Sequence, residues 1–302
     1  MSDPFDPSLL ADLPTEARNP ASERLDALST ADVLQVIHAA DCEAVAAVER
    51  ELPRIAAAID AIVARLENGG RLFYLGAGTS GRLGVLDASE CPPTYSAPPE
   101  LVQGVIAGGD VALRRSIERA EDDPGQGVRD LEERGFSAGD VLVGIAASGR
   151  TPYVLGGLEF ARRLGALTIG LSCVPGSPIA EAAEIEITPA TGAEIVTGST
   201  RMKAGTATKL VLNMISTAVL VRLGYVYGNL MVNVQPTNSK LADRAARIIS
   251  TITGLAQPRA QQLLAEAGSV KTAVVMYRLG LSRAEANQRL EIAHGRLRDA
   301  LK

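Results

Sequence analysis

One stretch sets the architecture of this chain: Leu72-Phe73-Tyr74-Leu75-Gly76-Ala77-Gly78-Thr79-Ser80-Gly81-Arg82. An apolar run ends in three glycines within six residues and a helical pattern follows, which predicts a strand, a tight turn and the start of a helix. The first backbone N–H groups of a helix lack intrahelical partners and carry the positive end of its dipole. Gly78 and the hydroxyl groups of Thr79 and Ser80 lie at this point, so the turn is a predicted anion-binding site.

The same glycines match the dinucleotide fingerprint, with Gly76-x-Gly78-x-x-Gly81. A dinucleotide site needs an acidic residue about 20 positions later, at the end of the next strand, to bind the ribose hydroxyls. Glu100 precedes the next apolar run and Asp110 comes late after it. A smaller phosphorylated ligand is therefore favoured over a dinucleotide.

Apolar runs alternate with helical patterns beyond residue 70. The strand-like runs are 71–75, 101–107, 140–146, 166–171 and 184–188, and the helical patterns lie near 80–89, 110–121, 151–164 and 175–182. This alternation predicts an α/β fold, a doubly wound parallel sheet with helices on both faces. In such sheets ligands bind beyond the carboxyl ends of the strands, so the loops after the strands are the place to look for chemistry.

Three parts are predicted along the chain. Residues 1–30 form an N-terminal arm whose segment 15–20 is too polar for a core, 31–240 form the α/β domain, and 241–302 form a helical region. A capped helix begins near Ser29, and Ala44–Leu66 is a long amphipathic helix. The last part, 257–302, is typical of a small three-helix module.

Composition narrows the class of protein. The net charge of −5 and the lack of a long basic run argue against nucleic acid or an anionic membrane as a partner. Three scattered cysteines, Cys42, Cys91 and Cys173, suggest reduced thiols in the cytoplasm, and no metal-ligand spacing is visible. The N-terminus lacks the pattern of a signal peptide. The longest apolar run, Leu210–Leu223, is interrupted by polar residues and is interpreted as a core or interface helix.

Two further loops resemble the first. Ser148-Gly149-Arg150-Thr151-Pro152 follows the third strand, and Gly198-Ser199-Thr200 precedes a helix expected at 201–223. A serine or threonine at a helix start is usually a cap, and that alternative holds for any single loop. Three such loops on one sheet favour a pocket that binds a compact polyhydroxylated phosphate through hydroxyl and backbone donors.

Carboxylates are the candidates for acid–base chemistry. Both histidines, His38 and His294, lie outside the strand-end loops, and Cys91 has no histidine partner. Glu90 precedes Pro92-Pro93, which are expected to end its helix. Glu118 and Glu121 are expected at i and i+3 on one face of the helix after the second strand.

Longer motifs carry a family resemblance. The segment 76–94, which ends in Leu86-Asp87-Ala88-Ser89-Glu90-Cys91-Pro92-Pro93-Thr94, and the segment Gly198-Ser199-Thr200-Arg201-Met202-Lys203-Ala204-Gly205-Thr206 closely resemble the N-acetylmuramic acid 6-phosphate etherases, bacterial enzymes of cell-wall sugar recycling. Residues 145–153 and 228–232 match as well, and the likeness extends from residue 15 to the C-terminus. The wider group is the sugar isomerase (SIS) domain superfamily.

The resemblance implies a homodimer on a flavodoxin-like parallel sheet, with no metal or organic cofactor. It implies a proton donor at Glu90 and a second acid or base at Glu121, in an Ala-Glu-Asp motif. The substrate phosphate would be bound by the serine and threonine loops, and the residues expected to bind the substrate are Gly78, Thr79, Ser80, Ser148, Gly149, Thr151 and Ser199.

The implied reaction removes D-lactate from N-acetylmuramic acid 6-phosphate by elimination and hydration. Two alternatives remain open at this point. An aldose–ketose phosphosugar isomerase needs the same phosphate site and a base at C2, and a regulator resembling the glucokinase regulatory protein would bind a phosphosugar without turnover. A transcription regulator would carry a basic helix-turn-helix, and residues 1–70 contain no basic cluster.

Overall fold

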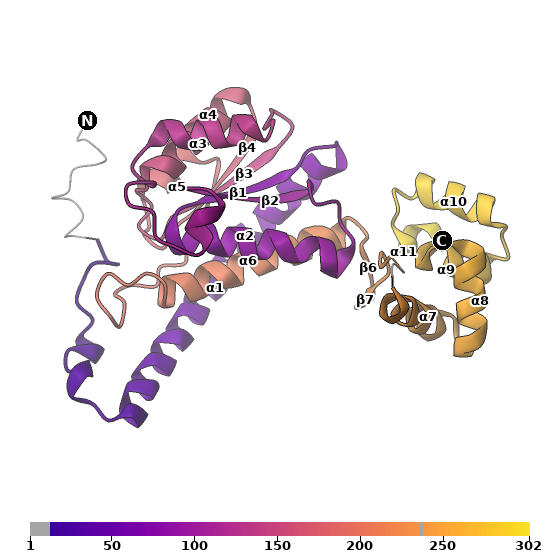
Figure 1. Ribbon diagram of the computed structural model, residues 1–302, viewed down its shortest axis with the longest axis horizontal. Helices are drawn as coiled ribbons and strands as arrows, with labels where there is room; N and C mark the ends of the chain where they lie inside the picture. The colour runs from indigo at the N-terminus through magenta and orange to yellow at the C-terminus, as the bar shows by residue number, and fades with distance from the viewer. Residues whose placement is uncertain (1–12, 236–237) are drawn as a thin grey trace. The chain divides into compact units, whose positions relative to one another are not determined.

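The computed structural model describes residues 13–235 and 238–302 (Figure 1). Two compact units are present. The first contains the described residues up to Ser89 together with Glu100–Ser216, and the second contains Glu90–Pro99 and Thr217–Lys302. Residues 1–12 of the predicted N-terminal arm lie outside the described residues, and the domain division predicted at 30 and 240 stays a prediction.

The first unit is built on a five-stranded parallel sheet. Its strands are β1 Leu72–Gly76, β2 Val102–Ile106, β3 Val141–Ile145, β4 Leu167–Leu171 and β5 Ile185–Ile187, and they lie in the order β2-β1-β3-β4-β5. This is the order of flavodoxin-like doubly wound folds. The predicted fold class is confirmed, and all five predicted strands are present within two residues of the expected bounds.

Helices cover both faces of this sheet (Figure 1). One face carries α3 Pro124–Glu133, α4 Pro152–Leu164 and α5 Pro178–Ala182, and the other carries α1 Thr30–Glu67, α2 Gly78–Tyr95 and α6 Lys203–Arg222. Phe73 and Leu75 pack with Leu158 in the core beneath the first set. Tyr74 points to the other face, where Gly84 of α2 packs against its Cβ. Alternate strand residues are therefore buried on both sides, which explains the nearly continuous apolar runs.

The second unit is helical apart from one hairpin. The hairpin pairs β6 Val226–Tyr227 with β7 Leu230–Met231, and the helices that follow are α7 Ser239–Thr253, α8 Gln257–Ala267, α9 Val270–Leu279, α10 Arg283–Ile292 and α11 Leu297–Ala300. Val270, Val274 and Leu290 lie in its own hydrophobic core. The predicted three-helix module at 257–302 contains α8, α9 and α10 and also a fourth, short helix, α11.

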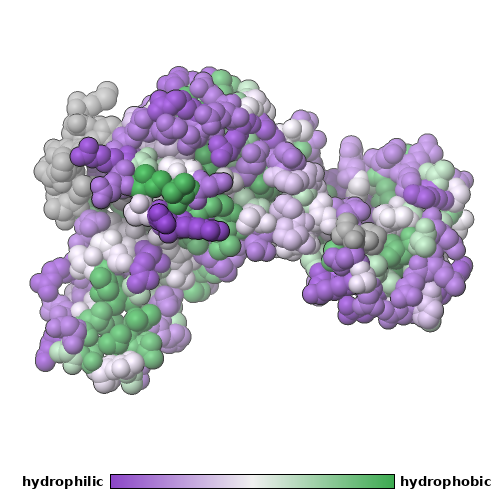
Figure 2. Space-filling view, viewed as in Figure 1, coloured by the Kyte–Doolittle hydropathy of each residue, from purple (hydrophilic) through white to green (hydrophobic). Residues whose placement is uncertain are grey.

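Helix α1 is capped by Ser29, as the sequence predicts, but it is continuous for 38 residues, so the predicted helix at Ala44–Leu66 is the second part of one helix. Two residues of its expected apolar face, Val45 and Leu52, are nevertheless 53% and 44% exposed, and Leu34 is 60% exposed. Figure 2 shows hydrophobic residues gathered over the N-terminal half of this helix. The described chain alone therefore leaves part of the apolar stripe of α1 in contact with solvent.

The segment before α1 is only partly polar surface. It contains two short 3-10 turns, Pro20–Ser22 and Leu25–Ala27. The expectation that residues 15–20 are too polar for the core is wrong at Thr15, which is fully buried, whereas Glu16, Ala17 and Arg18 are exposed. Packing around one small side chain outweighs the polarity of the segment.

The helix predicted at 110–121 is absent. A short 3-10 turn covers Asp110–Leu113, irregular chain follows, and α3 starts only at Pro124. Asp123 caps α3 by accepting from the N–H groups of Gly125 (2.8 Å) and Gln126 (3.2 Å), and Arg119 has a left-handed φ of 60°. Proline at the first helical position favours this later start. Glu118 and Glu121 consequently do not share a helix face.

Helix α2 continues through Pro92 and Pro93 to Tyr95, although these prolines were expected to stop it. Each proline removes one backbone N–H donor, but its carbonyl still accepts. The Pro92 carbonyl accepts from the N–H of Ser96 at 2.8 Å. Prolines in the last turn therefore shorten the hydrogen-bond ladder without ending the helix at Glu90.

One described helix, α6, is long and apolar enough to cross a membrane, with a mean hydropathy of 1.4 over its best window. More than half of that window, 56%, is buried inside the protein. Length and composition alone are weak evidence for a membrane span. The burial agrees with the core or interface helix expected from the sequence at Leu210–Leu223.

An ion pair joins the amino ends of β1 and β3, opposite the ligand edge of the sheet. Asp140 is 2% exposed and accepts from the backbone N–H (2.9 Å), Nε (3.1 Å) and Nη2 (2.8 Å) of Arg71. It also accepts from the N–H and hydroxyl of Ser137. Burial alone would raise the pKa of Asp140, but these hydrogen bonds outweigh it and hold the pKa below its usual value.

We expect Asp140→Ala to lower the free energy of unfolding by about 3 kcal/mol at pH 7, because the half-buried Arg71 loses its counterion. A carboxyl whose pKa is lowered by folding stabilises the protein above its unfolded-state pKa, so the difference from wild type should shrink as the pH falls below about 4. Urea unfolding at both pH values measures this, with the exposed Glu133→Ala as control. A difference that grows on acidification would contradict the assignment.

Candidate active site

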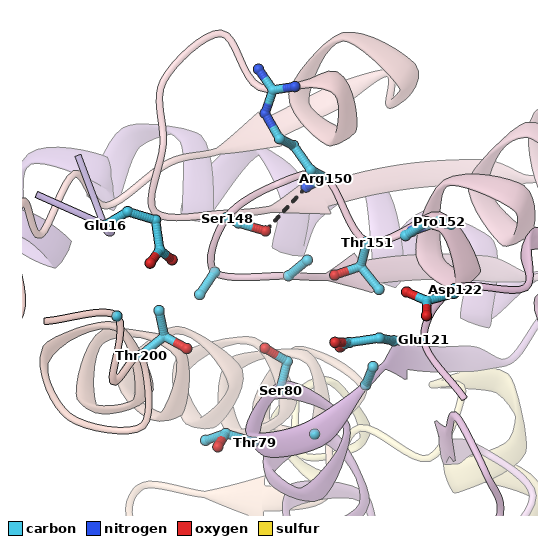
Figure 3. Close-up of a pocket in the computed structure, with 15 residues that line it drawn as sticks. Glu16, Thr79, Ser80, Glu121, Asp122, Ser148, Arg150, Thr151, Pro152 and Thr200 are labelled. Atoms are coloured by element: carbon cyan, nitrogen blue, oxygen red, sulfur yellow. Dashed lines mark hydrogen bonds between the residues drawn. The ribbon is translucent and has the colours of Figure 1, made fainter. Parts of the chain in front are cut away.

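A pocket of about 310 Å³ opens at the carboxyl ends of the strands (Figure 3). The sheet order reverses between β1 and β3, so the loops that leave these two strands diverge and leave a crevice there. The lining residues come from five segments of the first unit: Glu16; Ala77, Gly78, Thr79 and Ser80; Glu121 and Asp122; Ala146, Ala147, Ser148, Arg150, Thr151 and Pro152; Gly198 and Thr200.

The loop after β1 brings the start of α2 onto the sheet. A Cβ on Gly76 would lie 2.7 Å from the N atom of Gly81, and a Cβ on Gly81 would lie 2.6 Å from the Gly76 carbonyl oxygen. Both positions therefore require glycine. Thr79 and Ser80 lie in the first turn of α2, and neither hydroxyl has a hydrogen-bond partner among the described residues. Their donors and the N–H groups of this turn can face a ligand.

The loop after β3 repeats this arrangement at the start of α4. Gly149 has a φ of 69°, and a Cβ there would lie 2.2 Å from the side chain of Ser177. The Ser148 hydroxyl accepts from the N–H of Arg150 at 3.4 Å. Thr151 occupies the N-cap position of α4, yet its side chain makes no capping hydrogen bond. The capping explanation therefore does not apply to the Thr151 hydroxyl. With this loop, the N-termini of two helices, α2 and α4, lie at the pocket.

Glu121 reaches the pocket from the irregular segment after β2. Its backbone carbonyl accepts from the N–H of Tyr153 in the first turn of α4 at 3.0 Å, which fixes Glu121 beside that helix start. Tyr153 in turn donates its hydroxyl to Asp130 of α3 at 2.6 Å. Burial, followed by the Asp130 carboxylate, raises the pKa of Tyr153 above its usual value. Glu121 is therefore an exposed carboxylate whose backbone is tied to the start of α4.

The third predicted loop contributes Gly198 and Thr200, but its helix does not offer a free N-terminus. The buried Glu194 carboxylate accepts from the N–H of Lys203 (2.9 Å) and of Ala204 (3.0 Å). An acidic side chain already occupies the positive end of α6. The Lys203 ammonium pairs with Glu43 of α1 at 2.7 Å, so this loop is held from both sides.

A buried carboxylate network orients α2 against α6. Asp87 is 6% exposed and accepts from Asn213 Nδ2 (2.7 Å) and from the hydroxyl of Ser216 (3.1 Å). Burial raises the pKa of Asp87, and these hydrogen bonds act in the opposite direction. Cys173 is also buried, and burial raises the pKa of its thiol to about 12, which makes it a poor nucleophile.

Most of the predicted site residues lie together. The pocket is lined by Gly78, Thr79, Ser80, Ser148, Thr151 and Glu121. Gly149 and Ser199 are not lining residues, although both immediate neighbours of each are. Glu90 is exposed, does not line the pocket, and follows Gly78 by twelve residues of helix, about 18 Å at 1.5 Å per residue.

The sequence analysis missed several lining residues. Arg150 and Thr200 belong to loops that it singled out, and Asp122 adjoins Glu121, so their neighbours were the signal. In Figure 3 the guanidinium of Arg150 points away from the other labelled side chains. Glu16 lies 60 residues before the first predicted loop, and only its tertiary position reveals it.

The arrangement suits an anionic ligand that also needs acid–base chemistry. Hydroxyl donors come from the α2 and α4 starts and N–H donors from the first turn of α2, whereas carboxylates come from Glu16, Glu121 and Asp122. No group of three or more histidine, cysteine, aspartate or glutamate side chains with the geometry of a metal site occurs among the described residues.

Two family models match parts of the chain. The model for the N-terminal SIS domain of the glucokinase regulatory protein matches residues 54–162, and the SIS domain model matches residues 135–218. Among solved structures, a phosphoheptose isomerase from Francisella tularensis is similar at 20% identity with a TM-score of 0.46, covering 64% of this chain and 98% of that chain.

Curated relatives are far more similar. An N-acetylmuramic acid 6-phosphate etherase of Escherichia coli is 54% identical over 95% of this chain and 97% of its own. The etherase of Rhodopirellula baltica is 54% identical over 95% of this chain and 96% of its own, and that of Aeromonas hydrophila is 53% identical over the same shares. With identity of this level along nearly the whole length, the chain belongs to the N-acetylmuramic acid 6-phosphate etherase family.

Proposed function

We propose that the chain cleaves the D-lactyl ether of N-acetylmuramic acid 6-phosphate, giving N-acetylglucosamine 6-phosphate and D-lactate, in the recycling of peptidoglycan amino sugars. The observation that carries this proposal is the pocket at the β1/β3 crevice, where the exposed carboxylate of Glu121 faces the hydroxyls of the α2 and α4 starts. The identity to curated etherases over 95% of the chain supports it.

The phosphate would bind at the two helix starts. Ser80 and Thr79 on α2, and Ser148 and Thr151 before α4, offer hydroxyl donors. The first turn of α2 adds backbone N–H groups that have no partner within the helix. Two helix dipoles with their positive ends at one point favour a dianion without a metal. Such binding fixes the sugar carbons relative to Glu121.

The chemistry needs a base and an acid. In the ring-opened sugar the ether oxygen on C3 is β to the C1 aldehyde, so removal of the C2 proton forms an enolate. The enolate expels the lactyl oxygen as the C3–O bond breaks, and that oxygen takes a proton from the acid. Water then adds its oxygen to C3 while C2 regains a proton. Glu121 would remove the C2 proton or activate the water, and Glu90 would protonate the lactyl oxygen.

Glu90 does not line the pocket whose wall begins at Gly78 of the same helix. We therefore propose a homodimer in which each copy brings its Glu90 to the pocket of the other. The exposed apolar residues Leu34, Val45 and Leu52 of α1 support an interface with a second copy (Figure 2). An isologous contact would make both sites equivalent.

The cytoplasm is the proposed location. The three cysteines, Cys42, Cys91 and Cys173, are free thiols in the described chain, which is consistent with a reducing compartment. The substrate and a second copy of the chain are the proposed partners, and the net charge of −5 gives no support to nucleic acid or an anionic membrane.

Incubation of the protein with N-acetylmuramic acid 6-phosphate in oxygen-18 water tests the reaction. We expect unlabelled lactate and one heavy oxygen at C3 of N-acetylglucosamine 6-phosphate, because the C3–O bond breaks and water supplies the new hydroxyl. Mass spectrometry of both products measures this. Ligand binding without lactate release would refute the etherase proposal and favour a phosphosugar isomerase or the regulator suggested by the match at 54–162.

Mixed dimers of Glu90→Gln and Glu121→Gln test the shared site. Each variant alone should lose about 10²-fold to 10⁴-fold in kcat, because each lacks one proton-transfer group. If Glu90 acts in the partner's pocket, random mixing restores one complete site in each mixed dimer and thus about a quarter of wild-type activity. Steady-state rates after co-expression measure this. Activity no higher than that of the single variants would mean that no such exchange occurs.

Gly149→Ala tests the loop that would hold the phosphate. The new Cβ would overlap Ser177 at 2.2 Å and the φ of 69° disfavours alanine, so the loop must move. We expect inorganic phosphate to bind about tenfold more weakly, because the displaced loop would lose a hydrogen bond to a charged ligand. Calorimetric titration measures this. Gly165→Ala is the control, since it has a φ of 82° with no atom within 4 Å of its Cβ, and its phosphate affinity should not change.

A further inference from the structure

One pocket residue comes from a part of the chain that neither SIS model covers. Glu16 lines the pocket, whereas the two models begin at residues 54 and 135. Figure 3 shows its carboxylate directed into the pocket from the side opposite Glu121. The loops after β1 and β3 supply the hydroxyl donors between these two carboxylates.

The backbone around Glu16 is anchored, although its own side chain is exposed. The flanking Leu13 and Thr15 are 6% and 0% exposed. Asn19 Nδ2 donates to the Ala193 carbonyl at 3.1 Å, and the Ser22 hydroxyl donates to the Ile195 carbonyl at 2.7 Å. These bonds tie the segment to the loop that carries the lining residues Gly198 and Thr200. Glu16 therefore has a defined place at the pocket wall.

Gly198 leaves the space that Glu16 uses. Its φ is 74°, and a Cβ at this position would lie 2.9 Å from Oε2 of Glu16. The left-handed conformation and the close carboxylate both favour glycine here. The two segments are thus fitted to each other at the edge of the pocket, from positions 182 residues apart in the sequence.

The charge of Glu16 is unfavourable for a phosphate alone. Among the described residues its carboxylate has no ion pair or hydrogen bond, and it lies in the same pocket as the helix starts that would hold a dianion. The negative charge of the Glu16 carboxylate would repel the negative charge of a phosphate bound in the same pocket. The hydroxyl and acetamido N–H groups of an amino sugar are donors that a carboxylate accepts, with a stronger bond than a neutral acceptor forms.

We propose that Glu16 is a substrate-binding residue whose carboxylate accepts a hydrogen bond from a hydroxyl or the acetamido N–H of the bound sugar, away from the phosphate. This assignment rests on the proposed function, because it takes an amino-sugar phosphate as the ligand. Under this proposal, different parts of the pocket bind the two halves of the ligand. The helix starts bind the phosphate, and the segment before α1 distinguishes the sugar.

Calorimetric titration of two ligands tests the proposal. N-acetylglucosamine 6-phosphate should bind Glu16→Ala about tenfold or more weakly, which is the expected loss of a hydrogen bond to a charged group. Inorganic phosphate should bind equally well or more tightly, because a negative charge has left the pocket. Glu16→Gln should give a smaller loss for the sugar phosphate. Asn19→Ala removes a hydrogen bond that holds this segment, so it should also weaken binding of the sugar phosphate and should not weaken binding of inorganic phosphate, as in Glu16→Ala.

Glu23→Gln is the matched control, since Glu23 is exposed on the same segment and does not line the pocket. It should leave both affinities unchanged. Equal sugar-phosphate affinity in Glu16→Ala and wild type would overturn the proposal, and so would a parallel loss for both ligands, which would indicate a distorted pocket. The titration measures binding alone. A protein that binds the sugar phosphate through Glu16 but releases no lactate would therefore refute the etherase reaction and leave this assignment standing.

Discussion

The close approach of β1 to the first turn of α2 is the constraint on which the rest of the site depends. Gly76 and Gly81 bring backbone against backbone, and a Cβ on either would lie 2.6–2.7 Å from the other residue. The same Cβ on Gly81 would overlap Ile106 of β2 at 2.6 Å. The turn can therefore rest directly on the ends of two strands. This contact places the first turn of α2, with Gly78, Thr79 and Ser80, in the pocket wall.

The pocket contains helix-start donors for an anion and also carboxylates, and none of its described lining residues is a lysine. Two helix N-termini converge on it, while the third, that of α6, is occupied by Glu194. Lys203 is turned to Glu43 and the Ala193 carbonyl, outside the pocket lining. An ammonium group in the pocket would attract Glu121 as well as a phosphate and favour its ionised form. In the proposed site, dipoles and neutral hydroxyls would bind the anion and leave that carboxylate available for proton transfer.

The sequence predicts those parts of the fold and site that depend on local pattern. Apolar runs and glycine turns define the five strands and the loops that contain Ser80 and Ser148. The helix expected at 110–121 is wrong because the cap at Asp123 and the following proline start α3 later, which no periodicity reveals. Glu16 had no local signal at all. Its place depends on a hydrogen bond from Asn19 across 174 residues, and only the tertiary structure brings such positions together.

Helix α2 explains how one element can serve two sites in the proposed dimer. Its first turn lies in the pocket of its own chain, whereas Glu90 lies twelve residues further along the same helix and does not line that pocket. In a dimer with a two-fold axis, a residue that one copy contributes to its partner's pocket is also contributed by the partner to the first copy's pocket. The continuation of α2 through Pro92 and Pro93 then matters for chemistry. If the helix ended at Glu90, the proposed acid would lie at a frayed terminus, whereas the further residues to Tyr95 hold it within a regular helix.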